Sequence, residues 1–399
     1  MRASISCSAE IVPVSLLIFL SFVIGCGGAN QAGTSDNSGG GTITGTPAFT
    51  PPSSGDYLLQ ASDVNGVFVS TVNTSTGAVG SPVSQDTADL EGGMVVTPSN
   101  SFMYSISSGY ESINGYRLVG PGLQLQNLVP GAPFLLIAAH SISSMVIHPT
   151  GNFLYIIEAF GDSYIEQYKL DATTGALTSI GIATVSSLSE FSEGVFDPQG
   201  HFLYVCDGNS IYVYQINQST GALSPAQGSP FTVPAGGQAT HLGFDSNGSF
   251  LYATLFSGGL AAFAVNGSTG ALTNVAGSPF PTSQDGSTTA SMAINTATNT
   301  IYVSSYPDSK ITEFSIDETT GLPSLIAGSP VVVPGSAYQD GLGNLVVDPD
   351  AGVLFATIGP VKNNIVAMSI GKDTGALAVL PGAPFAGTGG RDIVHVKIP

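Results

Sequence analysis

Thr220-Gly221-Ala222-Leu223, followed by Gly228-Ser229-Pro230-Phe231, is a phrase that returns along this chain. Its next copy reads Thr269-Gly270-Ala271-Leu272, then Gly277-Ser278-Pro279-Phe280. The turn glycine recurs at positions 77, 175, 221, 270, 321 and 375, in steps of 98, 46, 49, 51 and 54 residues. The first step spans two periods and contains one degenerate copy. A period of about 49 residues predicts a repeat architecture.

Each repeat contains short runs of β-branched and aromatic residues separated by turns. In one copy, Asp197-Pro198-Gln199-Gly200 joins a first run to Phe202-Leu203-Tyr204-Val205. Pro presets one turn dihedral there, and Gly accepts a positive φ. Residues 211–216 alternate as a strand does, and a fourth short strand is expected between the Thr-Gly turn and the Gly-Ser-Pro exit. Four short strands per repeat predict a β-propeller blade, and no long helix is expected after residue 50.

The copies number seven over residues 56–399. Blade two runs from Gly92 to Phe134 and carries Gly120-Pro121-Gly122 in place of the Thr-Gly turn. The N-terminal copy begins at Tyr57-Leu58-Leu59 without a first strand, while the chain ends with an unassigned strand at 393–398. We therefore predict an all-β, seven-bladed β-propeller of four-stranded antiparallel blades. Its ring is closed by the C-terminal strand, which removes the exposed sheet edges.

Composition excludes some classes of partner. The chain has 399 residues, 8 Lys and Arg, 27 Asp and Glu, and a formal net charge of −19. A chain this acidic, with no basic run, is not expected to bind nucleic acid or an anionic membrane surface through charge. A monomer is expected.

The N-terminus resembles an export signal. Residues 11–25 form an apolar stretch that is short for a membrane span and suits the core of a signal peptide. Val23-Ile24-Gly25-Cys26 resembles a bacterial lipobox, whose cysteine is lipidated; a plain signal peptide is the alternative. We expect a signal peptide at 1–25, a lipidated Cys26 with a flexible linker at 26–55, and the propeller at 56–399. The expected location is the outer membrane, periplasm or cell surface. Cys206 is then left without a disulfide partner.

The blade resembles that of a known family. Asp197-Pro198-Gln199-Gly200, the run 202–205 and Thr220-Gly221-Ala222-Leu223 are similar to the repeats of the seven-bladed propeller lactonases, which include 6-phosphogluconolactonase of the propeller type. The resemblance covers about 56–399 and implies a lactone hydrolase. Its shared residues are mostly turn and core residues, which specify the blade rather than the reaction.

The family's polar site matches this chain in part. Asp207-Gly208 keeps the Asp of the family's Asp-x-Gly. His241 keeps the histidine of Arg-His-Leu, although the arginine is Thr240 here. The glutamate of the family's Asn-Glu-Leu is Leu255, and Ser192 stands where a family histidine is common.

The order of the strands places other polar residues on the same rim, here called the upper end of the ring. The ends of the first strands contribute Gly93, Ser144, Glu193, His241, Ser291 and Asn344, and the loops after the second strands contribute Asp63, Tyr110, Glu111, Glu158, Asp162, Asp207, Tyr306, Asp308 and Lys310. Lactone hydrolysis needs a base and an oxyanion donor. Glu158, Glu193 or Asp207 could act as the base, and His241 as base or donor. The alternatives are a satisfied rim histidine, solvated rim carboxylates and, for Asp207, a cap of its own loop.

Two functions remain open at this point. The first is hydrolysis of a neutral sugar lactone, because a phosphorylated lactone would call for Arg or Lys at the rim. The second is a non-catalytic propeller that binds a glycan, a peptide or an envelope protein. No cofactor or metal is expected. Asp245-Ser246-Asn247-Gly248 resembles a calcium loop, but it stands where the other blades have a turn, and His148 occupies the Asp place of the same turn.

Overall fold

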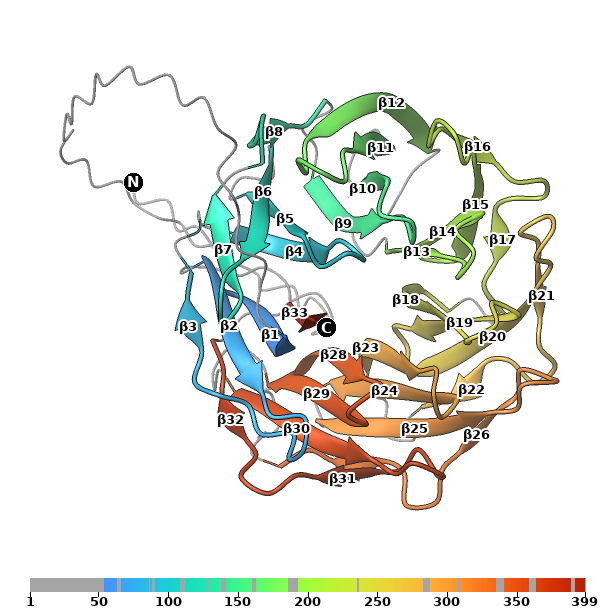
Figure 1. The fold of residues 1–399 in the computed structure, drawn as a ribbon. Coiled ribbons are helices and arrows are strands. Elements are labelled where there is room, and N and C mark those ends of the chain that lie inside the picture. Colours follow the sequence, from blue (N-terminus) through green and yellow to red (C-terminus); the bar gives the residue numbers. More distant parts are fainter. Residues whose placement is uncertain are drawn as a thin grey trace, which may run out of the picture. The chain divides into compact units, whose positions relative to one another are not determined.

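The computed structural model describes residues 54–62, 66–85, 87, 90–107, 112–127, 129–137, 141–159, 163–185, 193–234, 237–282, 288–306, 309–334, 341–358, 364–388 and 392–398. The chain divides into two units, 1–48 and 49–399. The first unit lies outside the described residues, and with it the signal peptide and Cys26. The second unit is a ring of seven antiparallel sheets, as the repeats predict (Figure 1).

The first three blades are built from these strands. Blade one has β33 (Ile393–Ile398), β1 (Gly55–Ser62), β2 (Gly66–Val72) and β3 (Val83–Ser84). Blade two has β4 (Leu90–Val96), β5 (Phe102–Ser107), β6 (Ser112–Val119), β7 (Gln124–Asn127) and β8 (Phe134–Leu135). Blade three has β9 (Ser141–Ile147), β10 (Phe153–Ala159), β11 (Ser163–Leu170) and β12 (Leu177–Val185).

The other four blades share one pattern. Blade four has β13 (Gly194–Phe196), β14 (Phe202–Asp207), β15 (Ser210–Ile216), β16 (Leu223–Pro225) and β17 (Phe231–Thr232). Blade five has β18 (Ala239–Phe244), β19 (Phe250–Leu255), β20 (Gly259–Val265), β21 (Leu272–Asn274) and β22 (Phe280–Pro281). Blade six has β23 (Thr288–Asn295), β24 (Thr300–Tyr306), β25 (Lys310–Ile316), β26 (Pro323–Leu325) and β27 (Val331–Val332). Blade seven has β28 (Leu342–Asp348), β29 (Val353–Ile358), β30 (Asn364–Ile370), β31 (Leu377–Val379) and β32 (Phe385–Ala386).

The outer edge of a blade holds one element that the sequence did not predict. In blades two, four, five, six and seven, a two-residue strand follows the exit turn and pairs with the third strand of its blade. Residues 231 and 232, for example, pair with 211 and 210. The third strand therefore has two short partners in succession. All regular elements in the described part of the chain are strands, and none of its segments forms a helix that could cross a membrane.

The C-terminal strand closes the ring, as predicted. β33 pairs antiparallel with β1, from Gly55 opposite Ile398 to Gln60 opposite Ile393. In Figure 1 the red β33 lies beside the blue β1. The first strand of blade one thus comes from the far end of the chain, so that β1 has a partner on each side.

The Thr-Gly turn forms because its side chains and its glycine satisfy the backbone locally. Asn217 Oδ1 accepts the N–H groups of Ser219 and Thr220 at 3.0 Å each. Gly221 has φ +77°, a conformation that side chains disfavour, and its N–H donates to the Asn217 carbonyl at 2.7 Å. A Cβ at Gly221 would also lie 2.4 Å from the ring of Phe153 in blade three. The turn therefore needs glycine for its dihedral and for its packing against the preceding blade.

A tyrosine joins each such turn to the preceding blade. The second strands of blades two to six carry tyrosines whose hydroxyls donate to the turn-glycine carbonyl of the following blade. The pairs are Tyr104–Gly175 (2.5 Å), Tyr155–Gly221 (2.7 Å), Tyr204–Gly270 (3.1 Å), Tyr252–Gly321 (2.9 Å) and Tyr302–Gly375 (2.7 Å). Burial raises the pKa of all five hydroxyls, so they remain protonated donors at neutral pH. We call these five contacts the tyrosine joints.

Candidate functional site

Glu193 and His241 form a pair across two blades at the upper end of the ring, where the first strands begin. Nδ1 of His241 lies 2.7 Å from Oε2 of Glu193, and the side chains are 29% and 37% exposed respectively. Glu193 directly precedes β13 of blade four, and His241 lies in β18 of blade five. The pair is therefore a close contact that solvent or a small molecule can reach.

Backbone contacts position both side chains. The N–H of Cys206 donates to the Glu193 carbonyl at 3.0 Å, and the N–H of His241 donates to Thr254 Oγ1 at 3.1 Å. The register between β18 and β19 shifts between Ala239 and His241, which makes a β-bulge. A bulge redirects the side chains next to it and is frequent beside functional sites. First strands β4, β9, β23 and β28 have register shifts as well, so the bulge is a general feature of these blades.

The same position makes a cross-blade contact in other blades too. Ser144 Oγ accepts the N–H of Gly194 at 3.3 Å, and Ser291 Oγ accepts the N–H of Leu345 at 3.2 Å. Asn344 Nδ2 donates to Asp392 Oδ1 at 2.8 Å. Glu193–His241 belongs to this series, but it is the pair here that combines a carboxylate with an imidazole. A carboxylate and an imidazole can transfer a proton, whereas the serine hydrogen bonds only hold neighbouring blades together.

Asp207 and Glu158 are placed outside this contact. Asp207 ends β14, where it is the cross-strand partner of Ser210. It directly follows Cys206, whose N–H donates to the Glu193 carbonyl. Glu158 lies near the end of β10 in blade three and is fully buried. The interpretation of Glu158 as a solvated rim charge was therefore wrong. Sequence position alone does not separate a strand end that is covered from one that is open.

Of the three positions at which this chain departs from the family's motif, Ser192 lies outside the described residues, and Thr240 and Leu255 lie within the protein. Thr240 Oγ1 lies 2.9 Å from Thr254 Oγ1, and Leu255 is buried in the core of blades four and five. Neither position presents a charge to the rim. Cys206 is completely buried, and burial together with the nearby Glu193 charge raises the pKa of its thiol. A thiol that is buried and protonated is a poor nucleophile.

Several predicted rim residues cannot be placed. Asp63, Tyr110, Glu111, Asp162 and Asp308 lie outside the described residues. Of the others, Lys310 begins β25 and Tyr306 ends β24, which puts both at the upper end.

Asp245 and His148 both lie in the turn after a first strand, as the sequence predicts. Asp245 Oδ1 accepts the N–H of Phe250 at 2.8 Å, so this carboxylate closes its own turn as the turn motif predicts. His148 is fully buried, with Nε2 at 2.8 Å from the Gly200 carbonyl and Nδ1 at 2.8 Å from Thr150 Oγ1. Both side chains have structural partners.

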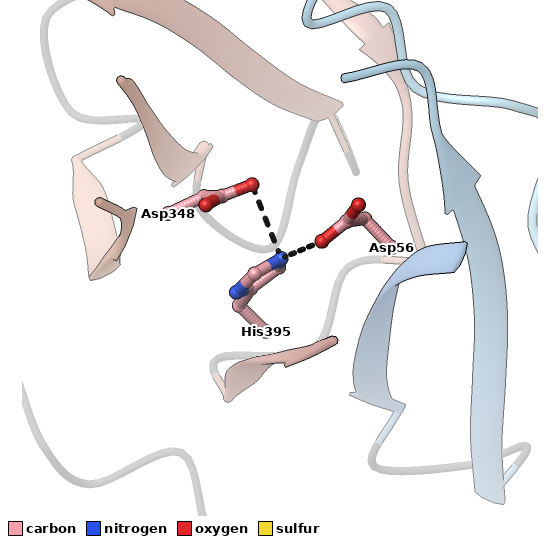
Figure 2. Close-up of side chains that lie close together, drawn as sticks. All are labelled: Asp56, Asp348 and His395. Atoms are coloured by element: carbon pink, nitrogen blue, oxygen red, sulfur yellow. Dashed lines mark ion pairs between the residues drawn. The ribbon is translucent and has the colours of Figure 1, made fainter. Parts of the chain in front are cut away.

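One cluster consists of residues that no sequence pattern had indicated as a site. Asp56, Asp348 and His395 converge at the lower end of the ring, where blade seven meets blade one (Figure 2). His395 Nε2 lies 3.3 Å from Asp56 Oδ1 and 3.4 Å from Asp348 Oδ2. No local spacing could have revealed three residues this far apart in the chain. The one signal is that His395 interrupts an apolar strand, opposite the buried Leu58.

A cavity of about 420 Å³ is bounded mainly by the first strands β4, β9, β13 and β33. Its lining is apolar and includes Val146, Val195 and Val394. It extends to Gly194, which directly follows Glu193. Pro98 and Pro149 of the lower turns also line it, so the cavity reaches the lower end of the ring, and neither Glu193 nor His241 lines it.

The pair has the chemistry of a general base. If the imidazole N–H at Nδ1 donates to Glu193, the neutral tautomer carries its lone pair on Nε2. The carboxylate then holds the ring and stabilises the imidazolium that forms when Nε2 accepts a proton. Such a pair can activate a water molecule for attack on an ester or lactone carbonyl.

Comparisons with known proteins identify the family. A family model described as "Lactonase, 7-bladed beta-propeller" matches residues 67–235 and 193–333. The chain is 25% identical over 239 residues to the 6-phosphogluconolactonase of Pectobacterium carotovorum subsp. carotovorum (strain PC1), covering 56% of this chain and 68% of that protein.

Solved structures share the fold. The periplasmic gluconolactonase of Pseudomonas aeruginosa superposes with a TM-score of 0.69 at 17% identity, covering 86% of this chain and 100% of that one. A protein from Lactobacillus plantarum superposes with a TM-score of 0.69 at 18% identity, with the same coverage of 86% and 100%. Together with the seven closed blades, the match to the family model shows that this chain belongs to the lactonase family of seven-bladed β-propellers.

Proposed function

We propose that the protein hydrolyses a neutral sugar lactone at the upper end of the ring. The observation that carries the proposal is the 2.7 Å contact between Nδ1 of His241 and Glu193, with both side chains partly exposed. Family membership supplies the reaction class, and the relatives named above are a 6-phosphogluconolactonase and a gluconolactonase. The pair supplies a base that suits that reaction.

The proposed reaction has two steps, and His241 takes part in both. His241 Nε2 accepts a proton from water while the water oxygen bonds to the lactone carbonyl carbon. The tetrahedral intermediate then expels the ring oxygen, and the imidazolium returns the proton to this leaving group. The product is the open hydroxy acid. Glu193 acts by fixing the imidazole tautomer and by stabilising its charged form, so its loss should cost less than the loss of His241.

The charge of the protein favours a neutral substrate over a phosphorylated one. The net charge is −19, which repels a phosphate. Among the described cations, Arg117 donates to the Thr173 carbonyl in a lower turn at 2.7 Å, and Lys397 binds Asp350. Lys310 is the described cation that begins a strand at the upper end. A phosphate site would call for a cluster of such residues.

The test is the rate of hydrolysis of glucono-δ-lactone by the purified full chain. We expect His241→Ala to lower the enzymatic rate by about 100-fold or more, the range for loss of a general base, and Glu193→Gln to lower it less. His201→Ala is the matched control, because His201 is an exposed histidine in a lower turn. It should leave the rate unchanged. Since the lactone also opens in buffer, every rate is measured against the protein-free reaction.

One outcome would assign the upper end to binding instead. Thr240 and the buried Leu255 replace the charged residues of the family motif, and this favours a non-catalytic propeller that recognises a glycan, a peptide or an envelope protein. A wild-type rate equal to that of buffer, with no effect of His241→Ala, would reject hydrolysis of this lactone and leave this second function.

We further propose that the protein is exported and anchored through a lipid on Cys26. The support is the apolar stretch 11–25, the lipobox-like sequence before Cys26 and the Gly/Ser-rich segment after it. The likeness to a periplasmic protein is consistent with export. Cys26→Ser should release the protein from the membrane fraction of cells, whereas Cys206→Ser should not.

A further inference from the structure

Three side chains from distant parts of the chain meet in one small space at the lower end of the ring. Asp56 comes from β1, Asp348 ends β28, and His395 lies in β33. Figure 2 shows both carboxylates directed toward one imidazole nitrogen. The three atoms that face one another, Asp56 Oδ1, Asp348 Oδ2 and His395 Nε2, all lie within 4.8 Å of one another.

These atoms are buried without hydrogen bonds. The side chains of Asp56, Asp348 and His395 are 6%, 1% and 10% exposed. Oδ1 of Asp56, Oδ2 of Asp348 and Nε2 of His395 make no hydrogen bond within the described part of the chain, although the N···O separations are short enough for one. Both carboxylates make ion-pair contacts with the same imidazole nitrogen, so the three atoms converge on one point (Figure 2). Buried polar atoms left in this state are costly unless something else satisfies them.

The donor atoms suit a cation at that point. The other oxygen of Asp348 accepts the N–H groups of Asp350 and Ala351 at 3.0 Å each, which leaves Oδ2 directed toward the cluster (Figure 2). Lys397, the cation near the cluster, is bound to Asp350. Two carboxylate oxygens and one imidazole nitrogen therefore face one another, and these are donor atoms that a divalent ion can bind.

Two of the three separations suit a tetrahedral ion, and the third, between the two carboxylate oxygens, is within 4.8 Å. Ligand atoms at about 2.0–2.1 Å from a zinc ion lie about 3.3–3.4 Å apart in a tetrahedron. The two N···O separations are 3.3 and 3.4 Å. Imidazole nitrogen also favours zinc over calcium, which prefers six to eight oxygen ligands at longer distances. We propose that Asp56, Asp348 and His395 bind a divalent transition metal ion of the zinc type.

The site has a structural consequence. Two ligands come from the strands that close blade one, and the third comes from the neighbouring blade seven. A metal there links the N-terminal strand, the C-terminal strand and the adjacent blade at a single point. Because the ligands assemble only in the folded ring, binding the metal stabilises the folded state.

The test uses the full chain, stripped with EDTA and then dialysed against Zn²⁺ or Ca²⁺. We expect one Zn²⁺ per chain by elemental analysis, no bound Ca²⁺, and a rise in Tm of at least about 3 °C with excess Zn²⁺. Substituted Co²⁺ should give the strong visible absorption of a tetrahedral site.

Two isosteric variants, Asp348→Asn and Asp56→Asn, should lose the ion and the shift in Tm. His241→Gln removes the histidine of the other histidine–carboxylate contact and should keep both. Wild-type protein that retains no Zn²⁺ overturns the proposal, and this measurement does not depend on whether a variant folds. Retention of one Zn²⁺ by both Asn variants overturns it equally.

Discussion

The boundaries between successive blades from blade two to blade seven differ from the two boundaries on either side of blade one. Each of the five tyrosine joints buries a hydroxyl that donates to a turn glycine of the next blade. In blade seven the same strand position is Phe355, and in blade one it is Leu59. Blade two, moreover, replaces the Thr-Gly turn by Gly120-Pro121-Gly122. The repeated hydrogen bond is thus absent from both sides of the blade that closes the ring.

The difference indicates that closure relies on other interactions. Blade one is completed by β33, whose Val396 is buried against Tyr57 and the neighbouring hydrophobic side chains. The Asp56–Asp348–His395 cluster lies at the same boundary. Regular joints use one shared hydrogen bond, whereas the closure uses apolar packing, strand pairing and a group of buried charges. The following substitutions test this contrast.

The largest effect is expected at the closing strand. Val396→Asp places a carboxylate at a position that is 1% exposed, and should cost more than about 4 kcal/mol in the free energy of unfolding. Urea denaturation, or the loss of soluble protein, measures this. Val332→Asp is the control, because Val332 lies on the outer strand β27 and is 64% exposed. A Val396→Asp protein that unfolds at the wild-type urea concentration would show that closure does not depend on this packing.

An intermediate effect is expected at the tyrosine joints. Tyr204→Phe leaves the Gly270 carbonyl without its donor, and should cost about 1–2 kcal/mol and lower Tm by about 2–4 °C. Tyr252→Phe removes the next joint and should add to this effect. Tyr214→Phe serves as the control, because Tyr214 is a buried tyrosine of blade four outside the joints, where burial raises its pKa to about 12. If all three variants melt alike, the joints contribute nothing specific.

The smallest effect concerns a second link between blades. Glu313 Oε1 accepts the N–H of Leu377 at 2.6 Å, just as Gln167 Oε1 accepts the N–H of Leu223 at 2.9 Å. Burial raises the pKa of Glu313. Its contribution to stability is therefore present below about pH 4.3, the ordinary value, and is lost as the pH rises through the folded-state pKa.

Glu313→Gln removes this titration while keeping the acceptor. The Tm difference, wild type minus variant, should fall between about pH 4 and pH 8. Gln167→Glu should introduce the same dependence in blade three. A Tm difference that is constant with pH would contradict the role of Glu313 burial.

The fold could be predicted because each repeat is marked by turn residues with strict local requirements. Gly221 requires glycine for its positive φ and for the contact with Phe153, so the turn is retained from copy to copy and reveals the period. Closure by residues 393–398 followed from counting strands. The tyrosine joints were not predicted, because the tyrosine and its acceptor lie 66 to 73 residues apart and belong to different blades.

The residues of the candidate site were predicted from the sequence, but the contact between them was not. Glu193 and His241 were both expected at the rim, but their contact depends on how two blades pack and on the bulge beside His241. Glu158 was misjudged, since its burial is set by neighbouring strands rather than by its own sequence. The cluster around His395 joins both ends of the propeller, so it is visible only once the ring has closed.

The tyrosine joint also bears on how such a protein can grow. A blade between the second and the seventh carries one hydroxyl donor for the blade after it and one turn carbonyl for the blade before it. Duplication of such a unit within this part of the ring would leave every donor and acceptor matched. The same duplication beside blade one would not. Gain or loss of a whole repeat is therefore chemically easiest in the interior of the gene. It is hardest at the two ends of the gene, which encode the strands that meet in the folded ring.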